Sequence, residues 1–177
     1  PRRSGFEELL GSLGHEIGQR WCCYVSLDHP NLEDDALLGI DGGHWSDLLS
    51  SGASLLYGHD WQNNGDGAFT SRATRSFYGP LDLYLAGFLP PEQLGSQFLI
   101  DNPALDPAVL PEERETADGT AVTFDGDAII RAEGPREPAA AESRRSYRAG
   151  FVLLARTGET IDPEHLAVLE RLRVDFA

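Results

Sequence analysis

Residues 15–21 read His-Glu-Ile-Gly-Gln-Arg-Trp and lie within the first regular hydrophobic pattern of the chain. Around them, large apolar residues recur at spacings of three and four: Leu9, Leu10, Leu13, Ile17, Trp21 and Val25. Such spacing is typical of an α-helix with one apolar face. The pattern predicts a helix over residues 6–24, with His15, Glu16 and Gln19 inside it.

Positions 15 and 19 of such a helix lie one above the other, because one turn takes 3.6 residues. The segment resembles the HExxH signature of zinc peptidases, in a variant that an aromatic residue follows. In that signature two histidines bind Zn²⁺, and the glutamate polarises the metal-bound water as a general base. The resemblance implies that His15 is a ligand and Glu16 the base, while Gln19 replaces the second histidine. Because an amide oxygen holds zinc less tightly than an imidazole nitrogen, zinc is expected to bind weakly or not at all.

Three further segments carry the same resemblance. They are LLGIDGGHWS at residues 37–46, HDWQNNGDGAFT at residues 59–70 and GPLDLYLAGFLPPE at residues 79–92. Together with the first helix they resemble a family of bacterial, exported, zincin-type proteins of poorly defined activity, whose last segment usually reads SPLDLYLMGLIPPEE. The resemblance implies an extracellular or cell-envelope location. Two departures, Gln19 and Ala86 in place of the usual methionine, indicate drift away from a working site.

A catalytic zinc site needs a third protein ligand. The position ten residues after His15, where metzincins place theirs, is Val25, which excludes that arrangement. His44 is the first candidate, because its glycine-rich turn can reach back over the helix; the alternative is a histidine that only packs or forms hydrogen bonds. Asp82 is the second candidate, because a carboxylate with Tyr84 two residues later is similar to the ligand of aspzincin peptidases. The alternative for Asp82 is an exposed acid at a helix N-terminus.

The remaining chemistry-bearing residues have simpler explanations. The adjacent Cys22 and Cys23 lie about seven residues beyond the first histidine, a rise of about 10.5 Å, so they are expected to be small buried residues. His59 and Asp60 are candidates for a cation site. The run NNGDG at residues 63–67 lacks the acidic ligand that an EF-hand needs at its twelfth position, and it predicts a tight hairpin turn.

Composition restricts the partners. The 177 residues include 14 basic and 29 acidic side chains, for a formal net charge of -15, and every basic residue is arginine. A field of that sign repels phosphate backbones, so nucleic acid is not an expected partner. No apolar run approaches the roughly 18 residues that a membrane-spanning helix needs. A peptide or protein substrate is the partner expected of an active site.

The other patterns predict an α+β chain weighted to helix. Helices are expected over residues 81–88, 127–133 and 163–176; short strands over residues 121–124, with a partner strand after a turn at 125–126, and over residues 151–155. Residues 26–74 are expected to form a long excursion with small helical turns and one hairpin, and residues 135–146 a surface loop. The fold class expected is α+β, the C-terminal part of a zincin-like domain, helix-weighted with a few short strands.

The resemblance also predicts the domain organisation. Zincins in general place a sheet before the signature helix, and its edge strand holds the peptide substrate. Residues 1–177 are therefore expected to be a single zincin-like domain, as a fragment that lacks the upstream sheet. The uncovered apolar face of the first helix then predicts self-association. Two functions stay open: zinc-dependent peptide hydrolysis, and a non-catalytic binding or structural module of an exported bacterial protein. Gln19 favours the second.

Overall fold

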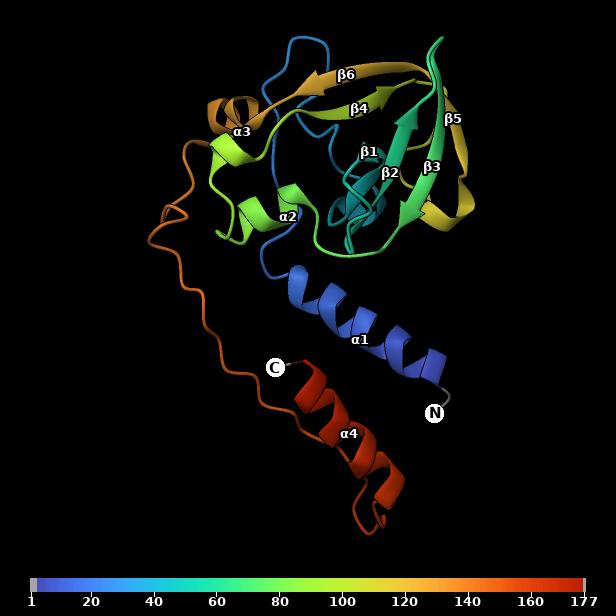
Figure 1. The fold of residues 1–177 in the computed structure, drawn as a ribbon, viewed down its shortest axis with the longest axis vertical. Coiled ribbons are helices and arrows are strands. Elements are labelled where there is room, and N and C mark those ends of the chain that lie inside the picture. The colour runs from blue at the N-terminus through green and yellow to red at the C-terminus, as the bar shows by residue number, and fades with distance from the viewer. Residues whose placement is uncertain (1–2, 177) are drawn as a thin grey trace. The chain divides into compact units, whose positions relative to one another are not determined.

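A computed structural model describes residues 3–176 of the chain (Figure 1). The described helices are α1 (Arg3–Gly18), α2 (Pro80–Leu85), α3 (Gly126–Glu133) and α4 (Pro163–Asp175). The described strands are β1 (Trp45–Ser50), β2 (Tyr57–Asn63), β3 (Ala68–Thr74), β4 (Gln97–Asp101), β5 (Thr116–Asp118) and β6 (Thr120–Phe124). Short 3₁₀ turns lie between them: η1 (Ile40–Gly42), η2 (Pro91–Gln93) and η3 (Pro111–Glu113).

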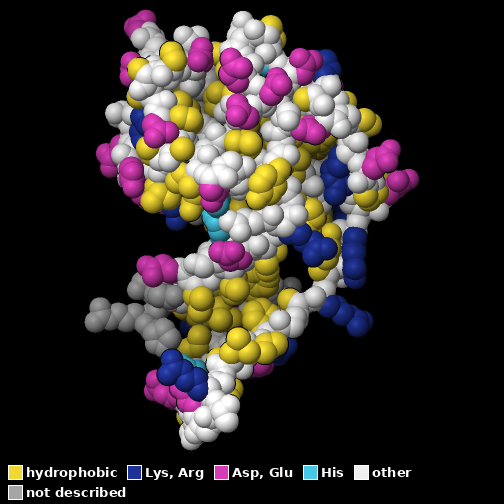
Figure 2. All heavy atoms as spheres, turned by 180° about the vertical axis from the view of Figure 1, so that it is seen from behind, with side chains coloured by type: hydrophobic (Ala, Val, Ile, Leu, Met, Phe, Trp, Pro, Cys, Tyr) yellow, Lys and Arg dark blue, Asp and Glu magenta, His cyan; other side chains and the backbone are white. Residues whose placement is uncertain are grey.

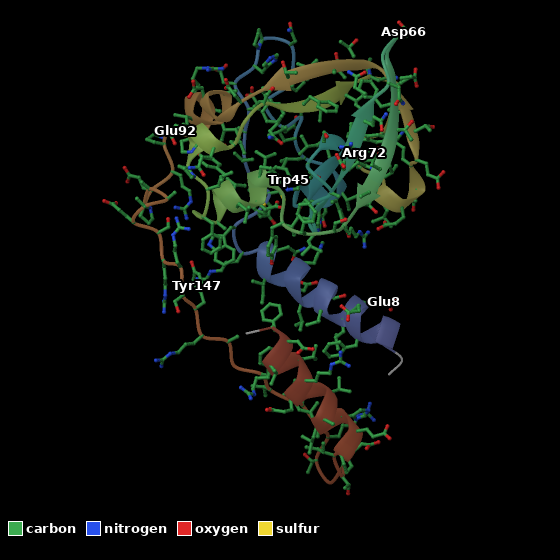
Figure 3. The ribbon with its side chains drawn as sticks, viewed as in Figure 1. Glu8, Trp45, Asp66, Arg72, Glu92 and Tyr147 are labelled. Carbon is green, nitrogen blue, oxygen red and sulfur yellow. The ribbon has the colours of Figure 1, made fainter. Side chains whose placement is uncertain are left out.

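The strands form a six-stranded mixed sheet in the order β5-β3-β2-β1-β4-β6. β1 and β2 run parallel, and the other neighbouring pairs are antiparallel. The β2–β3 hairpin closes in a tight turn, where Asn64 N donates to Ala68 O at 2.9 Å, and Figure 3 shows Asp66 at its tip. The hairpin turn predicted at residues 63–67 is confirmed.

The α+β class is confirmed, but the expectation of a helix-weighted chain with a few short strands is wrong, because the sheet is the main element. Strand β1 has five buried residues out of six, so its sequence lacks the apolar–polar alternation that reveals a half-buried strand. Strand β2 buries His59 completely, although a histidine is not a typical core residue. The region 26–74 therefore holds β1, β2 and β3.

The ends of the first two predicted helices lie earlier than expected. Helix α1 stops at Gly18 rather than at residue 24, and a Cβ at this glycine would lie 2.8 Å from the ring of Tyr78. The end of the helix therefore packs against Tyr78 at a distance that only glycine, which has no Cβ, permits. Helix α2 stops at Leu85, and Gly87 follows with φ 81°, a left-handed conformation that ends a helix.

The predicted strand at residues 121–124 is confirmed as β6, but the partner strand expected after it is wrong. Asp125 accepts hydrogen bonds from the backbone N–H groups of Asp127 and Ala128, which makes it the N-cap of α3. The helix predicted at 127–133 is thus confirmed, and β6 pairs with β4 instead. The helix predicted at residues 163–176 is confirmed as α4.

The predicted strand at residues 151–155 is wrong, because this run has no regular structure. Val152 and Leu154 are 78% and 89% exposed. An apolar run of strand length forms a strand only where neighbouring backbone completes its hydrogen bonds and covers its side chains. No described strand pairs with these residues, and the side chains of Val152, Leu154 and Ala155 are exposed.

Two compact units make up the chain: Gly11–Ser143, which contains the sheet, and a second unit formed by residues up to Leu10 and from Arg144 onward. The core of the sheet unit gathers side chains from every strand; its largest fully buried members include Trp45, Phe69, Leu49, Leu56 and Ile129. Figure 2 shows acidic side chains spread over the face of this unit that it draws. In the second unit, the guanidinium of Arg171 on α4 lies 3.8 Å from the ring centroid of the buried Phe6.

Among the described residues, no helix combines the length and the apolar character that crossing a bilayer requires.

Candidate functional site

Three of the predicted site residues converge in the sheet unit. His15 lies in the last turn of α1, Gln19 follows the helix directly, and His44 precedes β1. The Nε2 atoms of His15 and His44 are 3.0 Å apart. The side-chain nitrogen of Gln19 lies 3.1 Å from His15 Nε2 and 2.9 Å from His44 Nε2. We call these three side chains the HQH cluster.

The other ring nitrogen of each histidine is held by an acceptor. His15 Nδ1 donates to the backbone oxygen of Leu55 at 2.7 Å, and His44 Nδ1 donates to Asp41 Oδ1 at 3.0 Å. A carbonyl and a carboxylate can only accept, so each Nδ1 carries the proton. The Nε2 atoms of both rings then face each other and the side chain of Gln19. Zinc-binding histidines in proteins are oriented by this same pattern of outer hydrogen bonds.

The loop before β1 builds the His44 side of the cluster. Asp41 in η1 has φ 55°, and its Oδ1 accepts from Gly43 N at 3.0 Å as well as from His44. The hydrogen bond from His44 is the largest cause that lowers the pKa of Asp41, against a smaller opposing effect of desolvation. The carboxylate therefore remains a charged acceptor for His44. The run Asp-Gly-Gly-His predicts a turn, but only the structure shows that the aspartate orients the histidine.

The aromatic ring of Tyr57 packs against both histidines of the HQH cluster. Its ring stacks on that of His44 at a centroid distance of 4.4 Å and lies 5.3 Å from that of His15. Arg75 lies 4.4 Å from the Tyr57 ring on a cation–π contact, and it pairs with Glu112 at 2.8 Å. Tyr57 has φ 80°, which is unusual for a bulky residue. Sequence reasoning missed this residue, since no pattern marks it.

Glu16, the predicted general base, is exposed on α1. It follows His15 directly, which places it about 100° around the helix axis from that ligand candidate. Its carboxylate therefore lies on the solvent side of the helix end that carries His15, and its catalytic role remains a prediction.

Asp82 belongs to a different network. It is 4% exposed at the start of α2, so the alternative expectation of an exposed helix-terminal acid is wrong. Its Oδ1 accepts from Trp45 Nε1 at 2.6 Å and from Cys22 Sγ at 3.3 Å, and its Oδ2 from Ser54 Oγ and Gly79 N, each at 2.6 Å. Burial raises the pKa of Asp82 although these four bonds oppose the shift. The geometry makes Asp82 an internal anchor rather than a member of the HQH cluster.

The cysteines and His59 also lie elsewhere. Cys22 and Cys23 are 1% and 0% exposed, as expected of small core residues, and burial raises the pKa of the Cys22 thiol far above its usual range. His59 Nδ1 lies 2.7 Å from Ser71 Oγ and its Nε2 2.7 Å from Asp47 Oδ1. The order hydroxyl, imidazole, carboxylate resembles a hydrolase triad, but His59 is fully buried and both its nitrogens are paired, which makes this a core network.

Only the two ring nitrogens of the HQH cluster can be compared with the spacing of metal ligands. Ligand atoms placed tetrahedrally at about 2.0–2.1 Å from zinc lie about 3.3–3.4 Å from one another. His15 Nε2 and His44 Nε2, at 3.0 Å, are closer than this by a few tenths of an ångström, and the atom of Gln19 that faces them is its nitrogen. The described residues contain no group of three His, Cys, Asp or Glu side chains that could hold a metal ion. Any metal in the HQH cluster would therefore depend on the amide of Gln19.

The chain was compared with protein-family profiles, with curated proteins and with solved structures, and none of them matches it. The chemistry of the HQH cluster must therefore be inferred from its own geometry.

Proposed function

We propose that this protein is a zinc-binding relative of zincin peptidases, and that the HQH cluster is its metal site. The observation that carries the proposal is the convergence of two histidine Nε2 atoms, 3.0 Å apart, in rings that are each held by an acceptor at Nδ1. A cation is the ligand that such a geometry suits best.

Each residue would have a separate task. His15 and His44 supply neutral imidazole nitrogens, and Gln19 supplies its amide oxygen once the amide is rotated. Zinc held in this way supplies a Lewis acid and a bound water of lowered pKa. Glu16, one residue beyond His15 and open to solvent, is the carboxylate available to take a proton from a nucleophilic water. Peptide hydrolysis is the reaction that these roles suit, and the resemblance of residues 15–21 to the peptidase signature supports it.

A second function remains in view because one observation favours it. The amide nitrogen of Gln19 lies within hydrogen-bond distance of both histidines. These hydrogen bonds can hold the HQH cluster together by themselves, as expected of a non-catalytic module of an exported bacterial protein. An extracellular or cell-envelope location is part of the same proposal and rests on the resemblance alone.

Isothermal titration of zinc into the chelator-treated full chain tests the proposal. We expect one zinc ion per chain, bound more weakly than submicromolar because one ligand is an amide. His15→Ala and His44→Ala should each abolish this binding. His165→Ala, which changes an exposed histidine of α4, is the matched control and should leave it unchanged. Zinc binding that survives His44→Ala would refute the site.

Peptidase activity is tested separately with Glu16→Gln. This variant keeps the size of the side chain but cannot accept a proton at neutral pH. We expect zinc binding to persist and hydrolysis of a casein or peptide-library substrate to be lost. If the wild type binds zinc but cleaves nothing in either assay, the non-catalytic function is the correct one.

A further inference from the structure

A groove of about 890 Å³ lies in the sheet unit, away from the HQH cluster. It is lined by residues of the segment 30–42, by residues of the segment 99–107 and by two residues of β1, Ser46 and Leu48. Both segments are bound to β1 by backbone hydrogen bonds: Ser46 N donates to Leu37 O at 2.7 Å, and Asp47 N donates to Pro107 O at 3.0 Å. The fold itself therefore holds the two sides of the groove in place. We call this feature the β1 groove.

Part of the lining of the β1 groove is apolar. Leu32, Leu38 and Leu105 line it, pack against the hydrophobic core on one side and are only half-buried. A ligand that covers these leucines removes apolar surface from water, which favours binding. The volume lies within the range of about 300–1,000 Å³ that is usual for ligand pockets.

The charged part of the lining has a single sign. Glu33, Asp35 and Asp101 line the β1 groove and are exposed. Within residues 3–176 none of the three carboxylates forms an ion pair with an arginine, and no basic residue lines the groove. Leucines beside uncompensated carboxylates suit a ligand that combines apolar side chains with positive charges. A phosphate-bearing ligand does not fit.

The same chain carries a segment with this chemistry. Residues 144–156 read RRSYRAGFVLLAR, with four arginines and no acidic residue, in a chain of net charge -15. The segment has neither helix nor strand, and its Val152 and Leu154 are 78% and 89% exposed. Arg148 and Arg156, on either side of the apolar run, are exposed, and neither guanidinium pairs with a carboxylate among the described residues. The 144–156 segment therefore complements the β1 groove in both charge and hydropathy.

We infer that the 144–156 segment of one copy of this chain binds in the β1 groove of a second copy. The apolar run covers the leucines of the groove, and Arg148 and Arg156 pair with its carboxylates. Because every copy carries both the groove and the segment, two copies can exchange segments reciprocally and form a closed dimer. No atom of the HQH cluster takes part, so the inference is independent of the proposed zinc site.

Sedimentation equilibrium of the full chain in chelator tests the contact through two charge-reversed variants. The groove variant carries Glu33→Arg, Asp35→Arg and Asp101→Arg, and the segment variant carries Arg148→Glu and Arg156→Glu. Each variant places like charges opposite each other and should weaken the wild-type dimer at least about tenfold. Salt at about 1 M should weaken the wild-type dimer too, since it shortens the Debye length to about 3 Å. The matched control reverses three exposed acids outside the groove and should dimerise like the wild type: Glu113→Arg, Glu115→Arg and Asp118→Arg.

An equimolar mixture of the groove variant and the segment variant shows whether the contact joins two copies. In the mixed dimer, the arginines of the reversed groove meet the glutamates of the reversed segment, and the other groove and segment are unchanged. Dimers should therefore form in the mixture although neither variant dimerises alone. A contact within one chain would leave the mixture monomeric, and that result would overturn the inference.

A synthetic peptide of residues 144–156 gives a second measurement that needs no variant protein. An excess of the peptide should dissociate the wild-type dimer, whereas the same peptide with Arg148→Glu and Arg156→Glu should not. A wild-type chain that is monomeric at all concentrations contradicts the inference, as does a dimer that resists both the peptide and the charge reversals. The latter result would assign self-association to another surface, such as the exposed leucine and isoleucine of α1.

Discussion

Replacement of Asp82 by alanine is predicted to destabilise the fold and to leave the zinc affinity unchanged. Asp82 is the second residue that the sequence suggested as a metal ligand, but its carboxylate is buried and accepts from four donors of the core. Figure 3 shows one of the donor residues, Trp45, beside α2, the helix that carries Asp82. Asp82→Ala removes the common acceptor of all four.

The magnitude follows from the donors that lose their partner. The structure describes no second acceptor for Trp45 Nε1 or for Gly79 N. Each buried donor left unsatisfied costs about 1–3 kcal/mol, so the two together cost about 2–6 kcal/mol. Removing a buried carboxylate also relieves its desolvation, and we expect a net loss of about 2–4 kcal/mol. In a chain of this length, about 1 kcal/mol shifts the melting temperature by roughly 2–4 °C.

Thermal unfolding followed by circular dichroism at pH 7 measures the loss, and calorimetric titration measures the zinc affinity of the same variant. Glu92→Ala, which removes an exposed carboxylate in η2, is the control and should melt like the wild type. An unchanged melting temperature of Asp82→Ala would refute the anchoring role. Loss of zinc binding with unchanged stability would make Asp82 a ligand after all.

The same carboxylate also predicts a pH dependence. Burial raises the pKa of Asp82 above its ordinary value of 3.8, so the folded protein binds this proton more tightly than the unfolded chain does. Its contribution to stability is complete below that ordinary value and is lost as the pH rises through the raised pKa. Asp82→Asn does not titrate. Urea unfolding between about pH 4 and pH 7 should show this falling component in the wild type and not in the variant.

Three further predictions concern the HQH cluster and α1. Asp41→Ala removes the acceptor that orients His44 and should weaken zinc binding about 10–100-fold; the exposed Asp35→Ala is its control, and equal affinities would show that Asp41 orients nothing. Gln19→His should raise the zinc affinity, and a titration without any gain would mean that the site needs more than one change. Self-association through α1, on which Leu9 and Ile17 are 39% and 36% exposed, should appear in light scattering as a dimer or larger species, against a stable monomer.

The sequence predicted the elements that depend on a local pattern. Helix α1, helix α4 and the hairpin turn at residues 63–67 each show their own periodicity or turn chemistry. The sequence-based prediction failed for strands whose formation depends on segments that are distant in the sequence. Strand β1 is buried on both faces by distant segments and shows no alternation, whereas the apolar run at residues 151–155 has the composition of a strand and no neighbouring strand.

The candidate site divides in the same way. The spacing of His15 and Gln19 on one helix face is local, and the structure brings them together with His44, as the glycine-rich turn suggested. The acceptor for His15 is the backbone carbonyl of Leu55. Because every residue has such a carbonyl, the sequence does not show which one accepts. Tyr57 depends on a left-handed φ at the start of β2, which tertiary packing imposes.

The replacement at position 19 changes what the cluster does without metal. In a signature with histidine at this position, a third imidazole would face the two that already lie 3.0 Å apart. An amide carries donors at one end and an acceptor at the other, separated by a single bond rotation. In the structure, Gln19 Nε2 lies within hydrogen-bond distance of both His15 Nε2 and His44 Nε2. These contacts hold the three side chains together by themselves, so zinc at the proposed site would be an additional ligand rather than a condition of the local structure.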